Sequence, residues 1–394
     1  MLAITNGKVV TVTCGTLDKG TVLIDGGKIV AVGRDVEIPA GAKVINARGK
    51  WVTPGLIDAH THISTFNAPM SRNGYNDGNE ITSPNTGFIR GLDALNPHDM
   101  GIGCARRAGL TTCYTGPGSA NVVCGTGISF KTKRGDTVYD IIIEGSEQMK
   151  MALGENPRSC YGSQKQLPST RMGVGAVLRE TLFNAKVYSD KLRAAEADES
   201  KKPEPNFRLD ALVPAIRGEM KCRIHCHRAD DIVTAVRIAK EFGLDFSIEH
   251  CTEGYKITKF LKENNIDCVV GPLTMGPEKQ EIWGTRLDTP AVLEQAGINF
   301  CLTEDNDANT KYLPMHVGLV MGYGLSEQTA FEAVTIRPAR LLGLDGRIGS
   351  LEAGKDADLA IWNGHPFSNM TRCEKTIIDG EVYDNLADTV SFSF

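Results

Sequence analysis

Trp51-Val-Thr-Pro-Gly-Leu-Ile-Asp-Ala-His60-Thr-His62-Ile63 is a short apolar segment that ends in two histidines spaced one residue apart. If the segment is a strand, residues i and i+2 point to the same side. Both imidazoles can then reach one metal ion, and imidazole suits zinc and neighbouring first-row metals. A pair alone is a weak signal, because two hydrogen-bonded surface histidines have the same spacing. The remaining chain has to supply the other ligands.

Length and composition describe an ordinary globular protein. The 394 residues exceed a typical single core, so we expect one large domain and one smaller domain. A hydrophobic content of 41% and a net charge of −5 give no sign of nucleic-acid binding. No long apolar segment indicates export or membrane spanning, so we expect a cytoplasmic protein. The eleven cysteines contain no Cys-x-x-Cys pair, and we expect reduced thiols.

Both ends of the chain have the pattern of short strands. Residues 3–10, 21–33 and 43–46 are apolar runs broken by Gly and Asp, and residues 25–27 form a hairpin turn. Residues 348–362 and 376–383 repeat this pattern. We therefore predict a small β-sandwich domain built from residues 1–53 and 346–394, around a central domain of residues 54–345.

The central region alternates short apolar runs with helical patterns. The expected strands are residues 55–58, 110–114, 148–153, 222–225, 245–249, 267–270 and 299–302. Between two of them, residues 229–242 have apolar residues at helical spacing and are followed by Gly243, a helix stop. Strands that alternate with helices indicate an α/β fold with a parallel sheet. About eight such units favour a closed, TIM-like (β/α)8 barrel over an open sheet.

Barrel enzymes carry their chemistry at the C-terminal ends of the strands. In this chain those positions hold His60 and His62 after the first strand, His225 after the fifth and His250 after the sixth. An acidic cluster, residues 303–307, follows the last strand. Four histidines and a carboxylate that converge on one mouth predict a catalytic divalent metal centre, with zinc as the expected metal.

This ordered set of motifs resembles the amidohydrolase superfamily, and especially its imidazolonepropionase-related and prolidase-like branch. The resemblance rests on residues 54–62, the strand-end histidines, the terminal aspartate and residues 349–361, and it covers nearly the whole chain. It implies a metal-dependent hydrolase that cleaves an amide-type C–N bond in a peptide-like or cyclic amide substrate, and a homo-oligomer. Carried over residue by residue, the metal ligands are His60, His62, His225, His250 and Asp305, and Asp305 also moves the proton.

Two features of the resemblance leave alternatives open. Binuclear members often carry a carboxylated lysine on the fourth strand that bridges the ions. Lys150 lies at the matching place, and Glu155 is an equal candidate for a bridging carboxylate. Both one and two ions are compatible with this chain. In the acidic cluster, strand-end placement favours Asp305 over Glu304 and Asp307.

Three further residues are candidates for substrate binding. His227 lies two positions after His225, so it could face the substrate or serve as an alternative ligand. Arg228 could bind a substrate carboxylate, or pair with a protein acid instead. Tyr75 belongs to a long loop, residues 64–85, and loops of this length inside compact domains tend to form lids or binding sites. The glycine-rich residues 116–127 lack a phosphate-binding motif, and we expect them to line the pocket.

Two rival functions follow from the same residues. One is a mononuclear metal-dependent deaminase that acts on an aminated heterocycle without a bridging residue. The other is a non-enzymatic scaffold, which the intact set of ligand candidates argues against. In each enzymatic case the expected partner is a small-molecule substrate, with neither nucleic acid nor a membrane involved.

Overall fold

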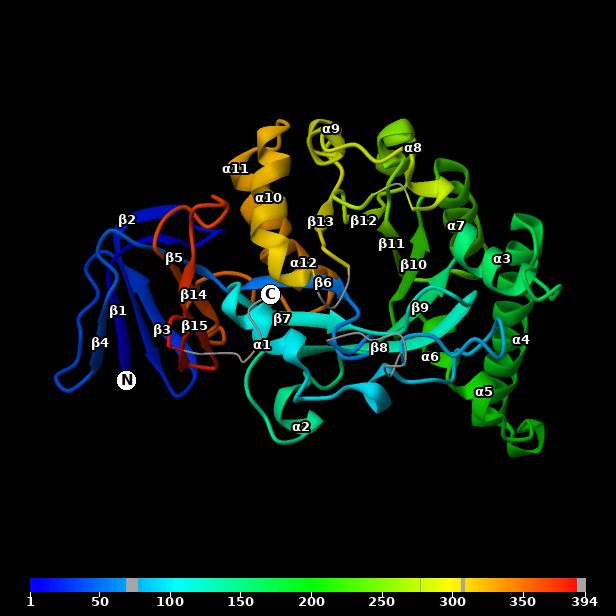
Figure 1. Ribbon diagram of the computed structural model, residues 1–394. Coiled ribbons are helices and arrows are strands. Elements are labelled where there is room, and N and C mark those ends of the chain that lie inside the picture. The colour runs from blue at the N-terminus through cyan, green and yellow to red at the C-terminus, as the bar shows by residue number, and fades with distance from the viewer. Residues whose placement is uncertain (69–76, 277, 306–308, 388–394) are drawn as a thin grey trace.

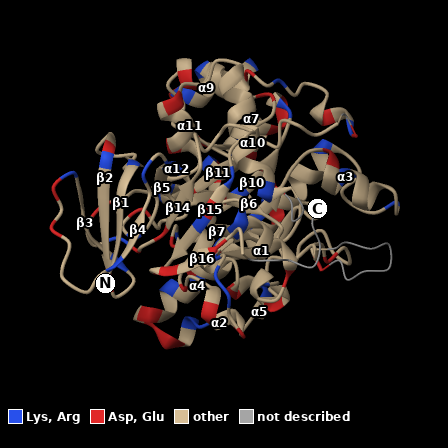
Figure 2. Cartoon of the chain, turned by 60° about the vertical axis from the view of Figure 1, so that its left-hand side comes forward, with Lys and Arg blue, Asp and Glu red and all other residues tan. Residues whose placement is uncertain are grey.

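The computed structural model describes residues 1–68, 77–276, 278–305 and 309–387. The chain forms an eight-stranded barrel and a separate β-sheet that contains strands from both ends of the sequence (Figure 1). Among the described residues, no helix combines the length and the apolar character needed to cross a membrane. Basic and acidic residues are interspersed over the elements visible in Figure 2.

The terminal sheet joins the two ends of the chain. Its strands are β1 (Leu2–Val10), β2 (Thr16–Asp25), β3 (Lys28–Gly33), β4 (Lys43–Asn46), β5 (Trp51–Pro54), β14 (Leu359–Trp362), β15 (Cys373–Ile378) and β16 (Glu381–Asp384). The ends meet where β14 pairs antiparallel with β5, and the eight strands form one hydrogen-bonded sheet around its own apolar core. The predicted turn between β2 and β3 is present, with Gly26 and Gly27 at φ of 54° and 78°. These left-handed conformations explain the choice of glycine.

The barrel confirms the fold class predicted from the sequence. Its strands are β6 (Leu56–Thr61), β7 (Leu110–Thr115), β8 (Val123–Lys131), β9 (Gln148–Ala152), β10 (Cys222–Cys226), β11 (Phe246–His250), β12 (Asp267–Val270) and β13 (Phe300–Leu302). They are neighbours in chain order, and all seven strands expected from the sequence are present. Seven of the eight strands run parallel, so their carboxyl ends open on the same side.

Strand β8 is the exception and corrects the prediction for residues 116–127. We expected a pocket-lining loop throughout, but Val123–Lys131 is a strand that pairs antiparallel with both β7 and β9. Glycines at 125 and 127 hid the strand pattern. At Gly127 a Cβ atom would collide with the carbonyl of Thr115, so glycine here permits close backbone approach between β7 and β8.

The first and last strands are joined through a buried aspartate. Thr303 Oγ1 donates to the carbonyl of His60 and to Asp58 Oδ1, at 2.7 Å in both cases. The backbone N–H of Glu304 donates to Asp58 Oδ2 at 3.0 Å. Burial raises the pKa of Asp58 to about 6 although these hydrogen bonds lower it. This contact places the residues that follow β13 beside the histidines that end β6.

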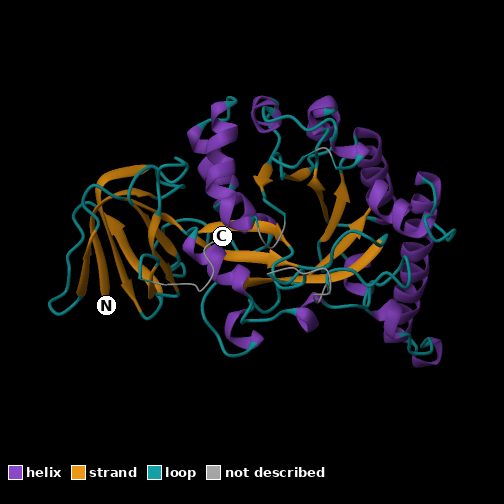
Figure 3. Cartoon of the chain, viewed as in Figure 1, coloured by secondary structure: helices purple, strands orange, loops and turns teal. Residues whose placement is uncertain are grey.

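Helices surround the barrel (Figure 3). They are α1 (Met100–Arg107), α2 (Val138–Ile141), α3 (Glu155–Gly162), α4 (Arg171–Ala197), α5 (Phe207–Asp210), α6 (Val213–Ile216), α7 (Ala229–Phe242), α8 (Thr258–Glu263), α9 (Thr289–Gln295), α10 (Leu313–Gly322), α11 (Glu327–Ala333) and α12 (Ile336–Leu341). Helix α7 has the predicted bounds and is capped by Gly243 in the left-handed conformation, with φ of 68°. Its apolar face packs on β10 and β11 and thereby supports two of the strands that carry site residues.

A buried ionic cluster connects the barrel to the terminal sheet. Lys131, the last residue of β8, lies 2.7 Å from Asp356 and 3.3 Å from Asp358, and it also pairs with Asp379. Asp356 and Asp358 lie just before β14, and Asp379 directly follows β15. Because the ammonium group of Lys131 is almost fully buried, it needs the aspartates as counter-charges.

Candidate metal centre

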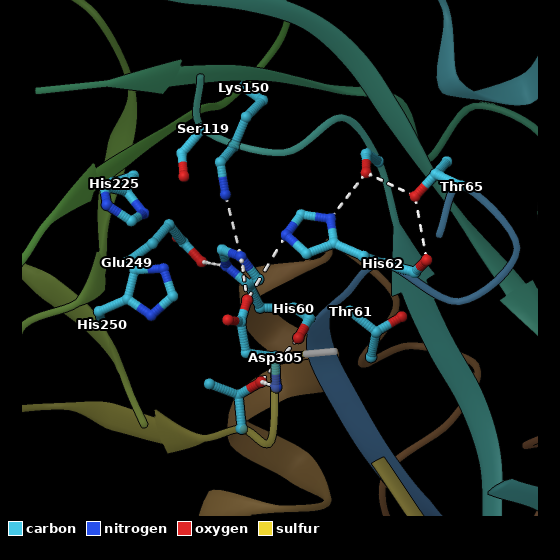
Figure 4. Close-up of polar contacts among 12 residues, drawn as sticks. His60, Thr61, His62, Thr65, Ser119, Lys150, His225, Glu249, His250 and Asp305 are labelled. Atoms are coloured by element: carbon cyan, nitrogen blue, oxygen red, sulfur yellow. Dashed lines mark hydrogen bonds and ion pairs between the residues drawn. The ribbon is translucent and has the colours of Figure 1, made fainter. Parts of the chain in front are cut away.

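The predicted ligands come together at the carboxyl ends of the strands, in two groups (Figure 4). The first group is His60, His62 and Asp305, and the second is His225, His227 and His250. Within each group, one nitrogen or oxygen atom per residue lies within 4.8 Å of the others. The structure therefore unites all four expected histidines with Asp305, and it adds His227 to the second group.

Four of the five histidines share an arrangement that prepares the ring for a metal. In each ring Nδ1 contacts an oxygen acceptor of the protein, which leaves Nε2 for a ligand. The acceptors are Glu249 Oε2 for His60 (2.5 Å), the carbonyl of Gly116 for His62 (2.9 Å), Thr252 Oγ1 for His227 (2.7 Å) and the carbonyl of Gly271 for His250 (2.8 Å). At the fifth ring, His225 Nε2 lies 3.4 Å from the side-chain amide nitrogen of Asn156.

Burial favours the neutral form of four of these histidines, His62, His225, His227 and His250. It lowers the pKa of His62 to about 4 and the pKa of His250 to about 3, in spite of the opposing charge of Asp305. Burial also lowers the pKa values of His225 and His227 well below their usual range, and a positive charge on His250, if that ring became protonated, would lower them further. Neutral imidazole is the form that binds metal ions, so the rings are ready to coordinate at neutral pH.

Asp305 supplies the carboxylate of the first group. Its Oδ1 lies 3.2 Å from His60 Nε2 and 3.5 Å from His62 Nε2. Burial raises the pKa of Asp305, but the charge of His250 and the contact with His60 outweigh burial and hold it well below the usual range. Within the described part of the chain, Oδ1 has no partner with hydrogen-bond geometry. An ionised, incompletely paired carboxylate beside two imidazoles fits a cation.

Of the two alternatives to Asp305, Glu304 does not lie in this group. The side chain of Glu304 is directed at His316, with Oε1 2.7 Å from Nδ1. Asp307 lies outside the described residues. The backbone of Asp305 is in the left-handed region, with φ of 68°, and so is that of His250, with φ of 69°. Strained non-glycine residues of this kind cluster at functional sites.

Lys150 and Glu155, the two candidates for a bridge, have different surroundings. Lys150 is buried on β9, and its Nζ lies 2.9 Å from His60 Nε2; in Figure 4 the amine lies between His225 and His62. Burial lowers the pKa of Lys150 although the charges of Glu249 and Asp305 raise it. Glu155, at the start of α3, accepts a hydrogen bond at Oε2 from the backbone N–H of Glu281 (3.2 Å). The structure thus brings Lys150 to the ligands and engages Glu155 with Glu281.

Two buried carboxylates near the ligands were missed at the level of sequence. Glu249 contacts His60 and lies 2.6 Å from Arg223 Nη2, and both Glu249 and Arg223 are fully buried. A charged residue inside an apolar strand, in Phe246–His250, was the available signal. Glu281 lies in the short 3-10 helix η4 (Gln280–Ile282), 3.8 Å from His225 Nε2, and no spacing in the sequence indicates it.

The ligand groups open into a cavity of about 710 Å³, which suits a small molecule. Phe66, Ser119, Asn156 and Lys279 contribute to its wall. Residues 118–120 line it, as expected for that part of the glycine-rich segment. Among the described residues that line the cavity, Arg228 is absent. Its guanidinium instead donates to the carboxylate of Asp230, at 2.8 and 2.9 Å. Tyr75 lies outside the described residues.

Comparison with known proteins gives a consistent result. The profile of the Amidohydrolase family matches residues 220–384. The crystal structure of an amidohydrolase from Thermotoga maritima MSB8 superposes with a TM-score of 0.93 at 39% identity, covering 97% of this chain and 99% of that one. Imidazolonepropionase of Maricaulis maris is 25% identical over 374 residues, 89% of this chain and 88% of that protein. Amidohydrolase tasK of Hapsidospora irregularis is 26% identical over 92% of this chain, which spans only 39% of that longer protein.

Proposed function

Because the chain belongs to the amidohydrolase family, we propose that it is a metal-dependent hydrolase that cleaves an amide-type C–N bond in a peptide-like or cyclic amide small molecule. The observation that carries this proposal is the pair of ligand groups at one cavity, because each group presents three nitrogen or oxygen ligands in a buried setting. Two such groups support two ions. They favour the hydrolase over a mononuclear deaminase.

The residues present fit divalent ions. His60, His62 and Asp305 would hold one ion, and His225, His227 and His250 a second. Zn²⁺ suits both, since neutral imidazole and carboxylate are its common ligands. When bound, such ions polarise a carbonyl and lower the pKa of water.

Lys150 is our choice for the bridging residue. Reaction of a lysine with carbon dioxide requires the neutral amine, and burial lowers the pKa of Lys150 in that direction. The product is a carboxylated side chain, which would supply oxygen ligands between the two groups. The contact of Lys150 Nζ with His60 Nε2, at 2.9 Å, supports this assignment.

Asp305 is our choice for the residue that moves the proton. Its carboxylate is ionised and lies at the cavity wall, so Oδ1 or Oδ2 can accept a proton from the attacking water and deliver it to the leaving nitrogen. Ser119, Asn156 and Lys279 form a hydrogen-bonded row on that wall. Asn156 donates to Ser119 Oγ at 2.7 Å and accepts from Lys279 Nζ at 3.0 Å. These polar groups would orient the substrate.

The proposal is tested by metal content and hydrolysis together. Protein purified without chelator should contain about two metal ions per chain, as measured by inductively coupled plasma mass spectrometry. Dialysis against a chelator should abolish hydrolysis of a panel of dipeptides and cyclic amides, and added Zn²⁺ should restore it. Lys150→Ala should lose metal, whereas Glu155→Gln should retain more of it. A content of one ion per chain that neither substitution changes, together with release of ammonia from aminated heterocycles, would instead establish the deaminase.

A further inference from the structure

Glu281 is a buried carboxylate beside the second ligand group. Its side chain is 0% exposed, and Oε1 lies 3.8 Å from His225 Nε2 and 3.7 Å from His227 Nε2. Nowhere in the described ranges does Oε1 have a partner with hydrogen-bond geometry. A cation, Lys279 Nζ, lies 2.8 Å from Oε1, and the same oxygen is also directed at two imidazoles, where it could accept a second cation.

The other carboxylate oxygen of Glu281 is held firmly. Oε2 accepts a hydrogen bond from the backbone N–H of Glu155 at 2.7 Å, and the backbone N–H of Glu281 donates back to Glu155 Oε2 at 3.2 Å. Gly154 permits this approach, because a Cβ atom there would lie 2.7 Å from Oε2. The reciprocal pair fixes the orientation of the carboxylate, so Oε1 stays directed at the histidines.

Lys279 compensates the charge of Glu281 only in part. Its Nζ lies 2.8 Å from Oε1 as an ion pair and also donates to Asn156 Oδ1 at 3.0 Å. The lysine side chain is 23% exposed, whereas the carboxylate is completely enclosed. An ionised carboxylate oxygen has more than one acceptor position. Lys279 and a second cation can therefore share it.

We infer that Glu281 is a ligand of the ion held by His225, His227 and His250, which completes a site of three imidazoles and one carboxylate. The inference rests on the proposed function, in which both groups hold ions. A tetrahedral zinc with bonds of about 2.0–2.1 Å separates its ligand atoms by about 3.3 Å. The distances of 3.7 and 3.8 Å from Oε1 to the imidazoles of His227 and His225 are slightly longer, and Glu281 lies outside the group whose ligand atoms are all within 4.8 Å of one another. Its carboxylate would therefore move closer when the ion binds.

The two metal sites then differ in their number of protein ligands. With the carboxylated Lys150 proposed above counted at both ions, the first would have four protein ligands, namely His60, His62, Asp305 and Lys150. The second would have one more, because Glu281 adds to Lys150 and the three imidazoles. Glu155 becomes a positioning residue, which acts through the carboxylate of Glu281.

Zinc titration of the metal-free protein tests the assignment. Competition with a chromophoric chelator measures each affinity, and Co²⁺ absorption reports the coordination. Glu281→Gln keeps the side-chain size and an acceptor for the N–H of Glu155 but removes the charge. We expect it to weaken the second ion by about 10- to 100-fold or more, the range found when supporting groups of metal ligands are lost. The Co²⁺ spectrum of that site should change as well.

Lys279→Met is the matched control. It removes the ion-pair partner and leaves the carboxylate, so the second ion should bind as in the wild type or more tightly. The inference is overturned if Glu281→Gln binds both ions with wild-type affinity. It is also overturned if Lys279→Met loses the second ion to the same extent, because Glu281 would then serve only to pair with Lys279.

Two controls separate the possible causes. Circular dichroism of the metal-free variants checks folding; if Glu281→Gln does not fold, Glu281→Asp, which withdraws the carboxylate by one methylene, should show the same selective loss. A wild-type protein that binds no ion at the second group would refute the proposed function. A wild type with two ions and an unchanged Glu281→Gln would refute only the role of Glu281.

Discussion

Glu249→Gln should destabilise the protein and weaken the first metal site. Glu249 lies between the guanidinium of Arg223 at 2.6 Å and His60 Nδ1 at 2.5 Å, and it accepts from Ser247 Oγ at 2.5 Å. Burial raises the pKa of Glu249, but the charge of Arg223 and the contact with His60 lower it well below its usual range. The carboxylate is therefore ionised at neutral pH and balances a buried cation.

The expected cost follows from the burial of this pair. Glu249 and Arg223 are both 0% exposed, so solvent does not screen their interaction. Removal of one partner of a buried ion pair costs about 3–5 kcal/mol, because the other charge stays buried and uncompensated. Arg223 would keep Gln148 Oε1 at 3.3 Å, the ring of Tyr114 at 4.6 Å and the neutral amide oxygen of the new side chain, but it would lose its buried counter-charge.

A melting experiment on metal-free protein measures this cost without a contribution from metal binding. Unfolding entropy is about 2.1 cal/mol/K per residue, or about 0.8 kcal/mol/K for 394 residues that unfold together. A loss of about 4 kcal/mol then lowers Tm by about 5 °C. The double variant with Arg223→Met removes both charges and should recover part of the loss.

The same variant should bind the first ion about 10- to 100-fold more weakly, since Glu249 holds the ring of His60. A Tm within about 1 °C of the wild type, together with unchanged zinc affinity, would refute the reasoning. The reasoning would also be refuted if the double variant lost more stability than the two single variants lose together.

Three further predictions concern the proton transfer, the domain contact and pH. Asp305→Asn should lower kcat by about 10²- to 10⁴-fold; full turnover in a steady-state assay would disprove its role. Lys131→Met removes the shared cation; Asp356 keeps Lys28 and Arg347 and Asp379 keeps Lys133, but buried Asp358 loses its ion pair, so calorimetry should show a loss on the order of 3 kcal/mol, and an unchanged transition would contradict this. In the metal-free protein, His62, His225, His227 and His250 have lowered pKa values, so the unfolded chain binds protons first and stability should fall as the pH drops from about 6.5 to about 4. Asp58 and Asp358 have pKa values raised to about 6 and oppose this trend, but they are outnumbered by the histidines. If the free energy of unfolding measured in urea did not fall over this pH range, the histidines would not be neutral in the folded protein.

The apolar periods of the helix and the strand explain which elements could be predicted from the sequence. Helix α7 matched its expected bounds because apolar spacing and the terminal Gly243 are both local signals. The seven parallel strands matched for the same reason. Strand β8 was missed because its glycines, required for close packing against β7, remove the apolar pattern by which a strand is found.

The choice between Lys150 and Glu155 shows where sequence reasoning stops. Lys150 lies within β9 and Glu155 begins the helix that follows it, so both were plausible from their position in the sequence. Only the folded chain places Lys150 Nζ beside His60 and joins Glu155 to Glu281, which comes from a loop 126 residues further along the chain.

The strand-end histidines and Asp305 could be found from sequence because a strand orients alternate residues alike and a parallel barrel brings its carboxyl ends together. The contacts that tune those ligands could not. His60 meets Glu249 across 189 residues, and Glu281 reaches His225 from the loop after β12. Such contacts depend on how the barrel closes and how its loops fold inward. Neither can be predicted from the local pattern of apolar and polar residues.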